Sequence, residues 1–336
     1  MCIQKLEGCI MNKKILFFPY NDKSFPLIEY VIKNNSNILV SSFKGSGLVG
    51  KDVAYATNSF DIGIKVIDIH LIDWNKISKV VLLDSQDAFD SSINLYDYLK
   101  KNVPVIDLRV SDEIPFEIRK ITPILTPIIY VFGIFDSVFN SRISLNLKYE
   151  LEKMGLKTSI LSADENLKYI EQPIYDASFL KKPEKLHISQ YKLLSQIKNM
   201  EKYSDVIVLQ VPGGFAQMND RVFNDFGVYF SFLNNIVQPD YLVCSLPIDY
   251  YTSEILKELE FVASTKFNKK IDSYAINNGY WRFSEGVLLG SQPRETYLPY
   301  SELLKVERTG NVYLNDYEFL AYKIVKKLED EDGKVN

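Results

Sequence analysis

The sequence has little histidine and cysteine, and neither residue occurs in a pattern that commonly holds a metal. Only two histidines, His70 and His187, and three cysteines, Cys2, Cys9 and Cys244, occur among the 336 residues. They form no CxxC, HExxH or Cys/His cluster, so we expect no metal: neither a structural zinc site nor a protein-ligated iron–sulfur cluster. The chain has no GxSxG elbow, which leaves Ser-His-Asp catalysis without support. An odd number of cysteines fits a reduced cytosol, so we expect a cytoplasmic protein.

Long apolar runs and a surplus of positive charge are also missing. The longest apolar stretches, such as residues 124–135 with the internal Pro127, are too short to span a bilayer. No segment has the layout of a signal peptide. The formal net charge is −4, whereas a general nucleic-acid binder shows a basic surplus or stripe. We therefore expect neither a membrane nor a nucleic acid as a partner.

Apolar runs of strand length alternate with helical patterns along the chain, which is typical of α/β folds with mainly parallel sheets. Strands are expected at 14–19, 37–42, 64–67, 79–84, 103–107, 128–133, 157–161, 205–211, 239–246 and 271–276. Helices are expected at 25–33, 92–101, 141–154, 183–202, 252–264 and 313–329. Three prolines between 115 and 127 mark a linker. The pattern predicts two Rossmann-like or P-loop-like domains, at 12–120 and 121–330, with a disordered extension over 1–11 and a tail over 331–336.

The stretch 128–144 has the layout of a phosphate-binding P-loop without its chemistry. A buried strand leads to Gly133 and then to a helix, as in the motif GxxxxGK[ST]. Counted from Gly133, the places of the second Gly, the Lys and the Ser/Thr hold Val138, Phe139 and Asn140. Without the lysine there is no point charge for the terminal phosphates, and valine restricts close backbone approach. We therefore expect no ATP or GTP hydrolysis, and Val138 and Phe139 disfavour a nucleotide as cofactor.

Polar residues in this loop are candidate ligands all the same. Asp136, Ser137 and Asn140, with Gly133, could bind a polar ligand at the helix N-terminus. Asp136 would repel a phosphate, so the ligand need not be an anion. The alternative is a relic loop that only connects strand and helix.

The strand at 205–211 takes the place of the Walker-B strand of a P-loop fold, but it has no magnesium-binding aspartate at its end. A glycine turn follows it directly. Candidates for a ligand-contact loop here are Gln210, Gly213, Gly214 and Asn219. The alternative is a plain turn.

Two polar segments follow strands of the first domain. In the loop 44–52, glycine N–H groups can face an anion that a lysine would neutralise, and its candidates are Gly45, Gly47, Gly50, Lys51 and Asp52. Asp84 and Ser85 lie at the end of another predicted strand, where α/β sheets bind ligands. The alternatives are a tight strand-to-helix connection and a helix N-cap. We expect all these loops, with 133–142 and 210–220, to converge on one cleft.

Residues 15–20, 44–52 and 84–85 resemble the amino-terminal half of the clostridial peptide-maturation system proteins. The second half is similar too, through residues 133–155, 212–214 and 218–227. Those proteins are encoded beside radical-SAM maturases and short precursor peptides in ribosomal natural-product (RiPP) clusters. The resemblance implies a cytosolic accessory protein that binds a precursor peptide, a radical-SAM maturase or a small ligand without hydrolysing NTP.

Other functions stay open at this point. A P-loop-derived, nucleotide-dependent transferase or ligase of the same pathway is the main alternative, so the sequence leaves open whether the protein is an enzyme. A small-molecule sensor without a peptide partner is a third. Aromatic residues, which make up 13% of the chain, could line a peptide groove or the interface of a homodimer, but core packing is their commoner fate. The aromatic residues concerned are Tyr229, Phe230, Phe232, Tyr250, Tyr251, Tyr280, Trp281 and Phe283.

Overall fold

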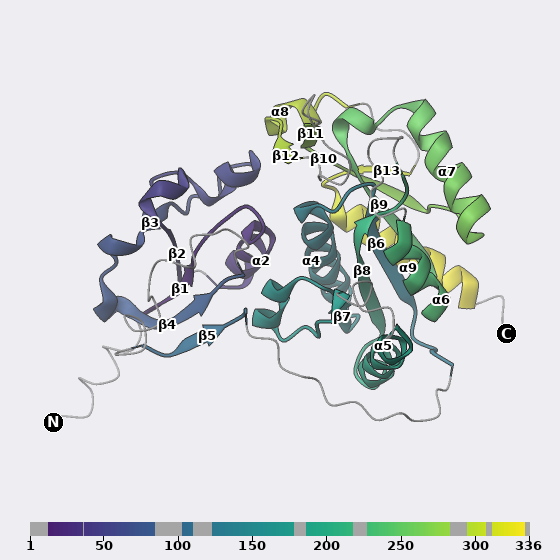
Figure 1. The fold of residues 1–336 in the computed structure, drawn as a ribbon, viewed down its shortest axis with the longest axis horizontal. Coiled ribbons are helices and arrows are strands. Elements are labelled where there is room, and N and C mark those ends of the chain that lie inside the picture. The colour runs from purple at the N-terminus through teal and green to yellow at the C-terminus, as the bar shows by residue number, and fades with distance from the viewer. Residues whose placement is uncertain are drawn as a thin grey trace. The chain divides into compact units, whose positions relative to one another are not determined.

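The computed structural model describes residues 13–35, 37–84, 103–109, 123–177, 186–217, 227–282, 294–306 and 311–332. The chain divides into two compact units (Figure 1). Unit 1 comprises residues 1–113 and 165–171, and unit 2 comprises 114–164 and 172–336. Each unit is built on a parallel sheet, which confirms the predicted α/β class. The expected helix at 92–101 and the expected extension at 1–11 lie outside the described residues, as do the last four residues of the chain.

Unit 1 holds a five-stranded parallel sheet in the order β3-β2-β1-β4-β5, which is the strand order of a Rossmann fold. Its strands are β1 (Lys14–Phe18), β2 (Ile38–Ser42), β3 (Val66–Asp68), β4 (Ile77–Leu82) and β5 (Val105–Asp107). Its helices are α2 (Phe25–Asn34) and the 3-10 helices η1 (Lys44–Ser46), η2 (Val53–Thr57), η3 (Ile69–Leu71) and η4 (Trp74–Lys76). Alternating residues of β1 serve two cores: Phe17 packs with α2, whereas Leu16 and Phe18 pack with η3 on the other face.

One face of this sheet is completed by a segment from much later in the chain. This is the face on which α2 packs against Phe17. The 3-10 helix η6 (Glu165–Ile170) lies on the same face, with the Tyr169 ring edge-on to Phe17 at 4.9 Å and Ile170 in the same cluster. The sequence pattern placed residues 165–171 in the second domain, whereas they cluster with unit 1.

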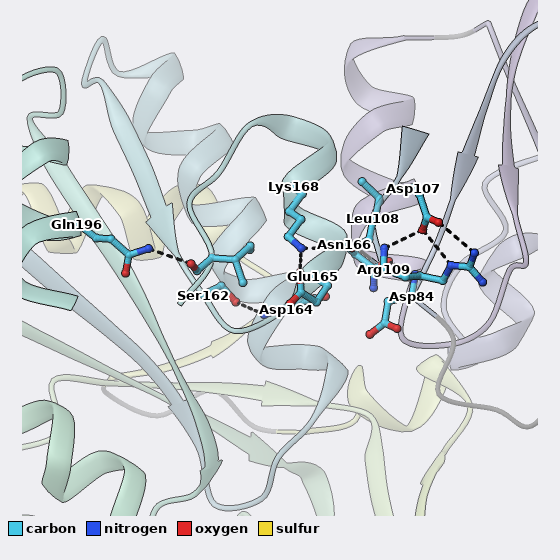
Figure 2. A network of polar contacts seen from close by, with 11 residues as sticks. Asp84, Asp107, Leu108, Arg109, Ser162, Asp164, Glu165, Asn166, Lys168 and Gln196 are labelled. Atoms are coloured by element: carbon cyan, nitrogen blue, oxygen red, sulfur yellow. Dashed lines mark hydrogen bonds and ion pairs between the residues drawn. The ribbon is translucent and has the colours of Figure 1, made fainter. Parts of the chain in front are cut away.

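Polar contacts hold this segment at the carboxyl ends of β4 and β5 (Figure 2). Oδ1 of the buried Asn166 accepts a hydrogen bond from the backbone N–H of Asp84 at 3.1 Å. Nζ of Lys168 donates to the carbonyl of Leu108 at 3.4 Å. The edge of the unit 1 sheet at which a Rossmann fold binds its ligand is thus partly occupied by the chain itself.

Unit 2 holds a six-stranded parallel sheet in the order β13-β10-β9-β6-β8-β7. Its strands are β6 (Ile128–Gly133), β7 (Thr158–Leu161), β8 (Val206–Gly214), β9 (Tyr241–Pro247), β10 (Ser273–Asn277) and β13 (Val312–Leu314). Its helices are α4 (Val138–Lys153), α5 (Leu186–Met200), α6 (Val228–Ile236), α7 (Ser253–Phe267), α8 (Tyr300–Leu303) and α9 (Tyr317–Asp332), with the 3-10 helix η10 (Ile248–Tyr250). The helix expected at 313–329 begins only at Tyr317, because Val312–Leu314 pair with β10.

The first strand of unit 2 is its centre. β6 pairs with β8 on one side and β9 on the other, so crossovers leave it in both directions and the helices divide between two faces. α5, α6 and α7 share a core with Tyr130 and Phe132, while α4 and α9 contact each other. Phe230 and Phe232 are buried in that core, so these two rings do not line a surface.

Two ionisable side chains are buried in this core. The Tyr130 hydroxyl donates to the carbonyl of Val237 at 2.6 Å, and burial raises the pKa of Tyr130 well above its usual value. Cys244 is buried on β9, and burial raises the pKa of its thiol as well. Both groups are therefore neutral at pH 7.

Replacing Tyr130 by Phe should lower the free energy of unfolding by about 1–2 kcal/mol, because the Val237 carbonyl loses its partner in a dry core. Urea denaturation followed by circular dichroism measures this. The matched control is Tyr203→Phe, whose ring is 55% exposed and whose loss of a hydroxyl should change stability by less than about 0.5 kcal/mol. Equal values for the two variants would contradict the assignment.

Candidate functional site

The turn from β6 into α4 is capped by its own serine. Ser137 has an extended backbone, and its Oγ accepts a hydrogen bond from the N–H of Phe139 at 3.2 Å. The N–H of Asn140 donates to the Ser137 carbonyl at 3.1 Å. Serine is a favoured N-cap because it satisfies donors that the first helical turn leaves unpaired. Two N–H groups that a P-loop would turn toward phosphate are therefore engaged within the protein.

Gly133 permits an unusually close approach inside this loop. A Cβ atom at Gly133 would lie 2.4 Å from the carbonyl oxygen of Phe135, and 3.0 Å from Oδ1 of Asn140. No side chain fits at these distances. The glycine at the strand end is thus required by the chain's own packing, whether or not a ligand binds there.

Asn140 stands at the Ser/Thr position of the motif and is completely buried. Among the described residues, neither its Oδ1 nor its Nδ2 has a hydrogen-bond partner. Its amide lies beside Gly133, so it turns back into the β6–α4 loop. An unpaired buried polar group costs about 1–3 kcal/mol, and such groups are rare enough in folded proteins to require an explanation.

A pair of antiparallel strands that no sequence pattern indicated covers this loop. β11 (Gly279–Arg282) pairs with β12 (Arg294–Tyr297), and Trp281 lies directly opposite Glu295. Directly opposite residues project from the same face of a two-stranded sheet. On that face the Trp281 ring packs on Phe135 at 4.5 Å, and Oε1 of Glu295 accepts a hydrogen bond from Ser137 Oγ at 2.5 Å. Glu295 could not be predicted from the sequence, because it reaches Ser137 only through tertiary structure.

The electrostatics of the loop differ from those of a P-loop. The carboxylate of Glu295 lies at the positive end of α4, where a P-loop holds phosphate. Phe139, at the lysine position, is buried and meets the Tyr297 ring edge-on at 5.9 Å. Asp136 is exposed on the same loop. An anion and an aromatic ring thus replace the cation and the open amides of the motif.

The side-chain amide of Gln210 is hydrogen-bonded to neighbouring side chains. Its Oε1 accepts from Ser162 Oγ at 2.9 Å, and its Nε2 donates to Ser141 Oγ at 3.0 Å. Ser141 also donates to Oδ2 of Asp164 at 2.7 Å. These bonds tie α4 to β8 and to the residue that follows β7, and Figure 2 shows Ser162 beside Asp164. The amide of Gln210 therefore has a structural role in this conformation.

The glycine turn after Gln210 is built into the sheet. Gly213 adopts a positive φ of 71°, which favours glycine, and Gly214 pairs with Gly133 in the register of β8 and β6. The two glycines predicted as ligand contacts thus lie beside the end of the central strand. Asn219 lies outside the described residues.

The candidate residues of unit 1 mainly shape their own loop. Gly47 and Gly50 have positive φ, at 72° and 84°, as turns require. The carboxylate of Asp52 caps η2 by accepting from Ala54 N–H at 2.9 Å, and it also accepts from Gly63 N–H at 2.8 Å. The Lys51 ammonium lies 3.7 Å from the centre of a tyrosine ring. This arrangement is that of a tight connection, whereas Ser85 lies outside the described residues.

Within the described ranges, no three His, Cys, Asp or Glu side chains lie close enough to hold a metal ion. The same residues include no helix with the length and apolarity needed to cross a membrane.

Comparison with known proteins identifies a shared fold. No protein-family model matches the chain, and no curated protein matches it. A DUF1611 family protein from Anabaena variabilis is similar in structure, with a TM-score of 0.52 and 11% identity over 79% of this chain and 88% of that one. A nucleotide-binding protein in complex with ADP from Archaeoglobus fulgidus has a TM-score of 0.32 and 13% identity over 58% and 84%. At 11% identity the first likeness shows the α/β fold alone, and the second is too loose to support an argument.

Gly133→Ala should lower the free energy of unfolding by about 1–3 kcal/mol, because its Cβ collides with the Phe135 carbonyl. Gly45→Ala is the control, since its Cβ would meet nothing within 4 Å. We expect that control to change stability by less than about 0.5 kcal/mol in urea denaturation. If Gly133→Ala were as stable as the wild-type protein, the loop would have to shift and accommodate the added Cβ.

Gln210→Met should destabilise the protein by about 1–3 kcal/mol, because the hydroxyls of Ser141 and Ser162 lose their buried partner. Gln238→Met is the matched control, because Gln238 is exposed. The same urea titration measures both. If the two variants were equally stable, the hydrogen bonds of Gln210 would not contribute to the stability of the protein.

Proposed function

We propose that this protein is a non-hydrolytic accessory protein in the maturation of a ribosomally synthesised peptide. It binds a precursor peptide or a radical-SAM maturase as its partner. The peptide-maturation context rests on the resemblance of residues 15–20, 44–52 and 133–155 to that family. The non-hydrolytic character is supported by one structural observation above all, the Glu295 carboxylate on the N-cap of α4.

The electrostatic energies at this loop disfavour the binding of a nucleotide. A phosphate oxygen about 4 Å from the Glu295 carboxylate would meet a repulsion of about 4 kcal/mol at an effective dielectric constant of about 20. The helix terminus offers an anion only about 0.3–1 kcal/mol, and up to about 2 kcal/mol when partly buried. The lysine that would supply the missing attraction is replaced by the buried Phe139. Phosphoryl transfer depends on such positioning and charge groups, so this loop is a poor site for it.

Thermal denaturation with Mg-ATP and with Mg-GTP tests this proposal. A ligand at about 100 times its Kd stabilises a protein by about 2.7 kcal/mol, which raises Tm by several degrees. We expect a shift of less than about 1 °C for either nucleotide, with magnesium chloride alone as the control. A clear shift together with turnover would favour the alternative, a nucleotide-dependent transferase or ligase.

Co-expression tests the partner. The tagged protein should co-purify with a radical-SAM maturase or with a precursor peptide encoded beside it, and an unrelated peptide of equal length is the control. If neither partner co-purifies, the accessory role is wrong.

A further inference from the structure

The N-terminus of α4 carries two features that a plain connecting loop does not need. One is the Glu295 carboxylate, which accepts from Ser137 Oγ at 2.5 Å. The other is the amide of Asn140, which is fully buried, turned into the loop and unpaired among the described residues. From these two observations we infer that the N-terminus of α4 is a carboxylate-binding site. Glu295 occupies the site in this structure, and the carboxylate of a peptide can take its place.

The donors of this site suit a planar carboxylate. Ser137 Oγ already donates to one oxygen of Glu295, and Nδ2 of Asn140 in the first turn of α4 is a donor without a partner in the described part of the chain. The positive end of the sixteen-residue helix adds a favourable field for a single negative charge. Gly279 makes the approach possible, since its Cβ would lie 3.1 Å from Oε1 of Glu295.

The same residues argue against phosphate. A phosphate group requires more positive charge than a carboxylate, and the position of the P-loop lysine holds Phe139, which packs against the Tyr297 ring. The occupant that the fold itself supplies is a carboxylate. The site therefore holds the Glu295 carboxylate and lies beside the rings of Phe139 and Tyr297.

The internal occupant sits on an element outside the six-stranded sheet. Glu295 belongs to the two-stranded β11–β12 sheet, and two strands alone are marginally stable. Two of the contacts at this pair are the Trp281 ring packed on Phe135 and the hydrogen bond from Nδ2 of Asn278 to the Leu298 carbonyl at 2.7 Å. A pair of strands outside the main sheet can open locally at a lower free energy than a core strand does. An incoming carboxylate can thus exchange with Glu295. Only the assignment of that carboxylate to a peptide rests on the proposed function.

Chemical rescue tests the site. Glu295→Ala should melt several degrees below the wild-type protein, and about 50 mM sodium propionate, which has the size of the removed group, should restore at least half of the loss. The wild-type protein should shift by less than about 1 °C in propionate. The double variant Glu295→Ala/Ser137→Ala should not be rescued, because its principal donor is gone. Sodium phosphate and sodium chloride at equal ionic strength should not rescue Glu295→Ala.

Absence of rescue by propionate would overturn the proposal, and equal rescue by phosphate would overturn its restriction to carboxylates. A second measurement covers the case in which Glu295→Ala does not fold. In a Trp74→Phe background, Trp281 is the only tryptophan, and its packing on Phe135 makes its fluorescence a reporter of the site. Glu295→Gln in that background should bind propionate at least about tenfold more tightly than its parent. Equal affinities would overturn the proposal.

The outcome is separable from that of the proposed function. Rescue by propionate without co-purification of a peptide would leave the carboxylate site standing and remove its assignment to a peptide. Co-purification without rescue would support the accessory role and remove this site.

Discussion

The close approach between the end of β6 and the first turn of α4 is the constraint on which the candidate site depends. Gly133 has no side chain, so the Phe135 carbonyl and the Asn140 amide pack directly against its backbone. That packing sets where α4 begins, and therefore that Ser137 becomes the N-cap. The N-cap in turn presents its hydroxyl to Glu295.

Hydrogen bonds elsewhere in unit 2 also hold α4 in place. The amide of Gln210 joins the hydroxyls of Ser141 in α4 and of Ser162 just after β7, so the helix is held on the sheet by directional bonds as well as by apolar packing. Such a network is favourable only when all its members are paired, and here they are. The unpaired amide of Asn140, one residue before Ser141, therefore stands out against a background of satisfied neighbours. This contrast is the reason for reading Asn140 as part of a binding site and not as an ordinary core residue.

Unit 1 is also completed by contacts from a distant part of the chain. Helix η6, which follows a strand of unit 2 in sequence, packs on the unit 1 sheet through Tyr169 and accepts a hydrogen bond just after β4 through Asn166. Residues of unit 1 that had been candidates for ligand binding, such as Asp52, are engaged in local turns. A fold that binds dinucleotides in other proteins is here closed partly by its own chain.

Sequence periodicity was sufficient to recover the alternation of strands and helices, the parallel sheets and the missing P-loop lysine, because these depend on local hydrophobic pattern and on residue identity. It could not reveal the β11–β12 pair, Glu295 beside Ser137, or the move of residues 165–171 into unit 1. Contacts between residues as far apart as 137 and 295 depend on how the sheet is wound, and a one-dimensional pattern carries no information on that winding. Burial of Asn140 without a partner was equally inaccessible, since only packing in three dimensions determines which polar atoms lose both water and a protein partner.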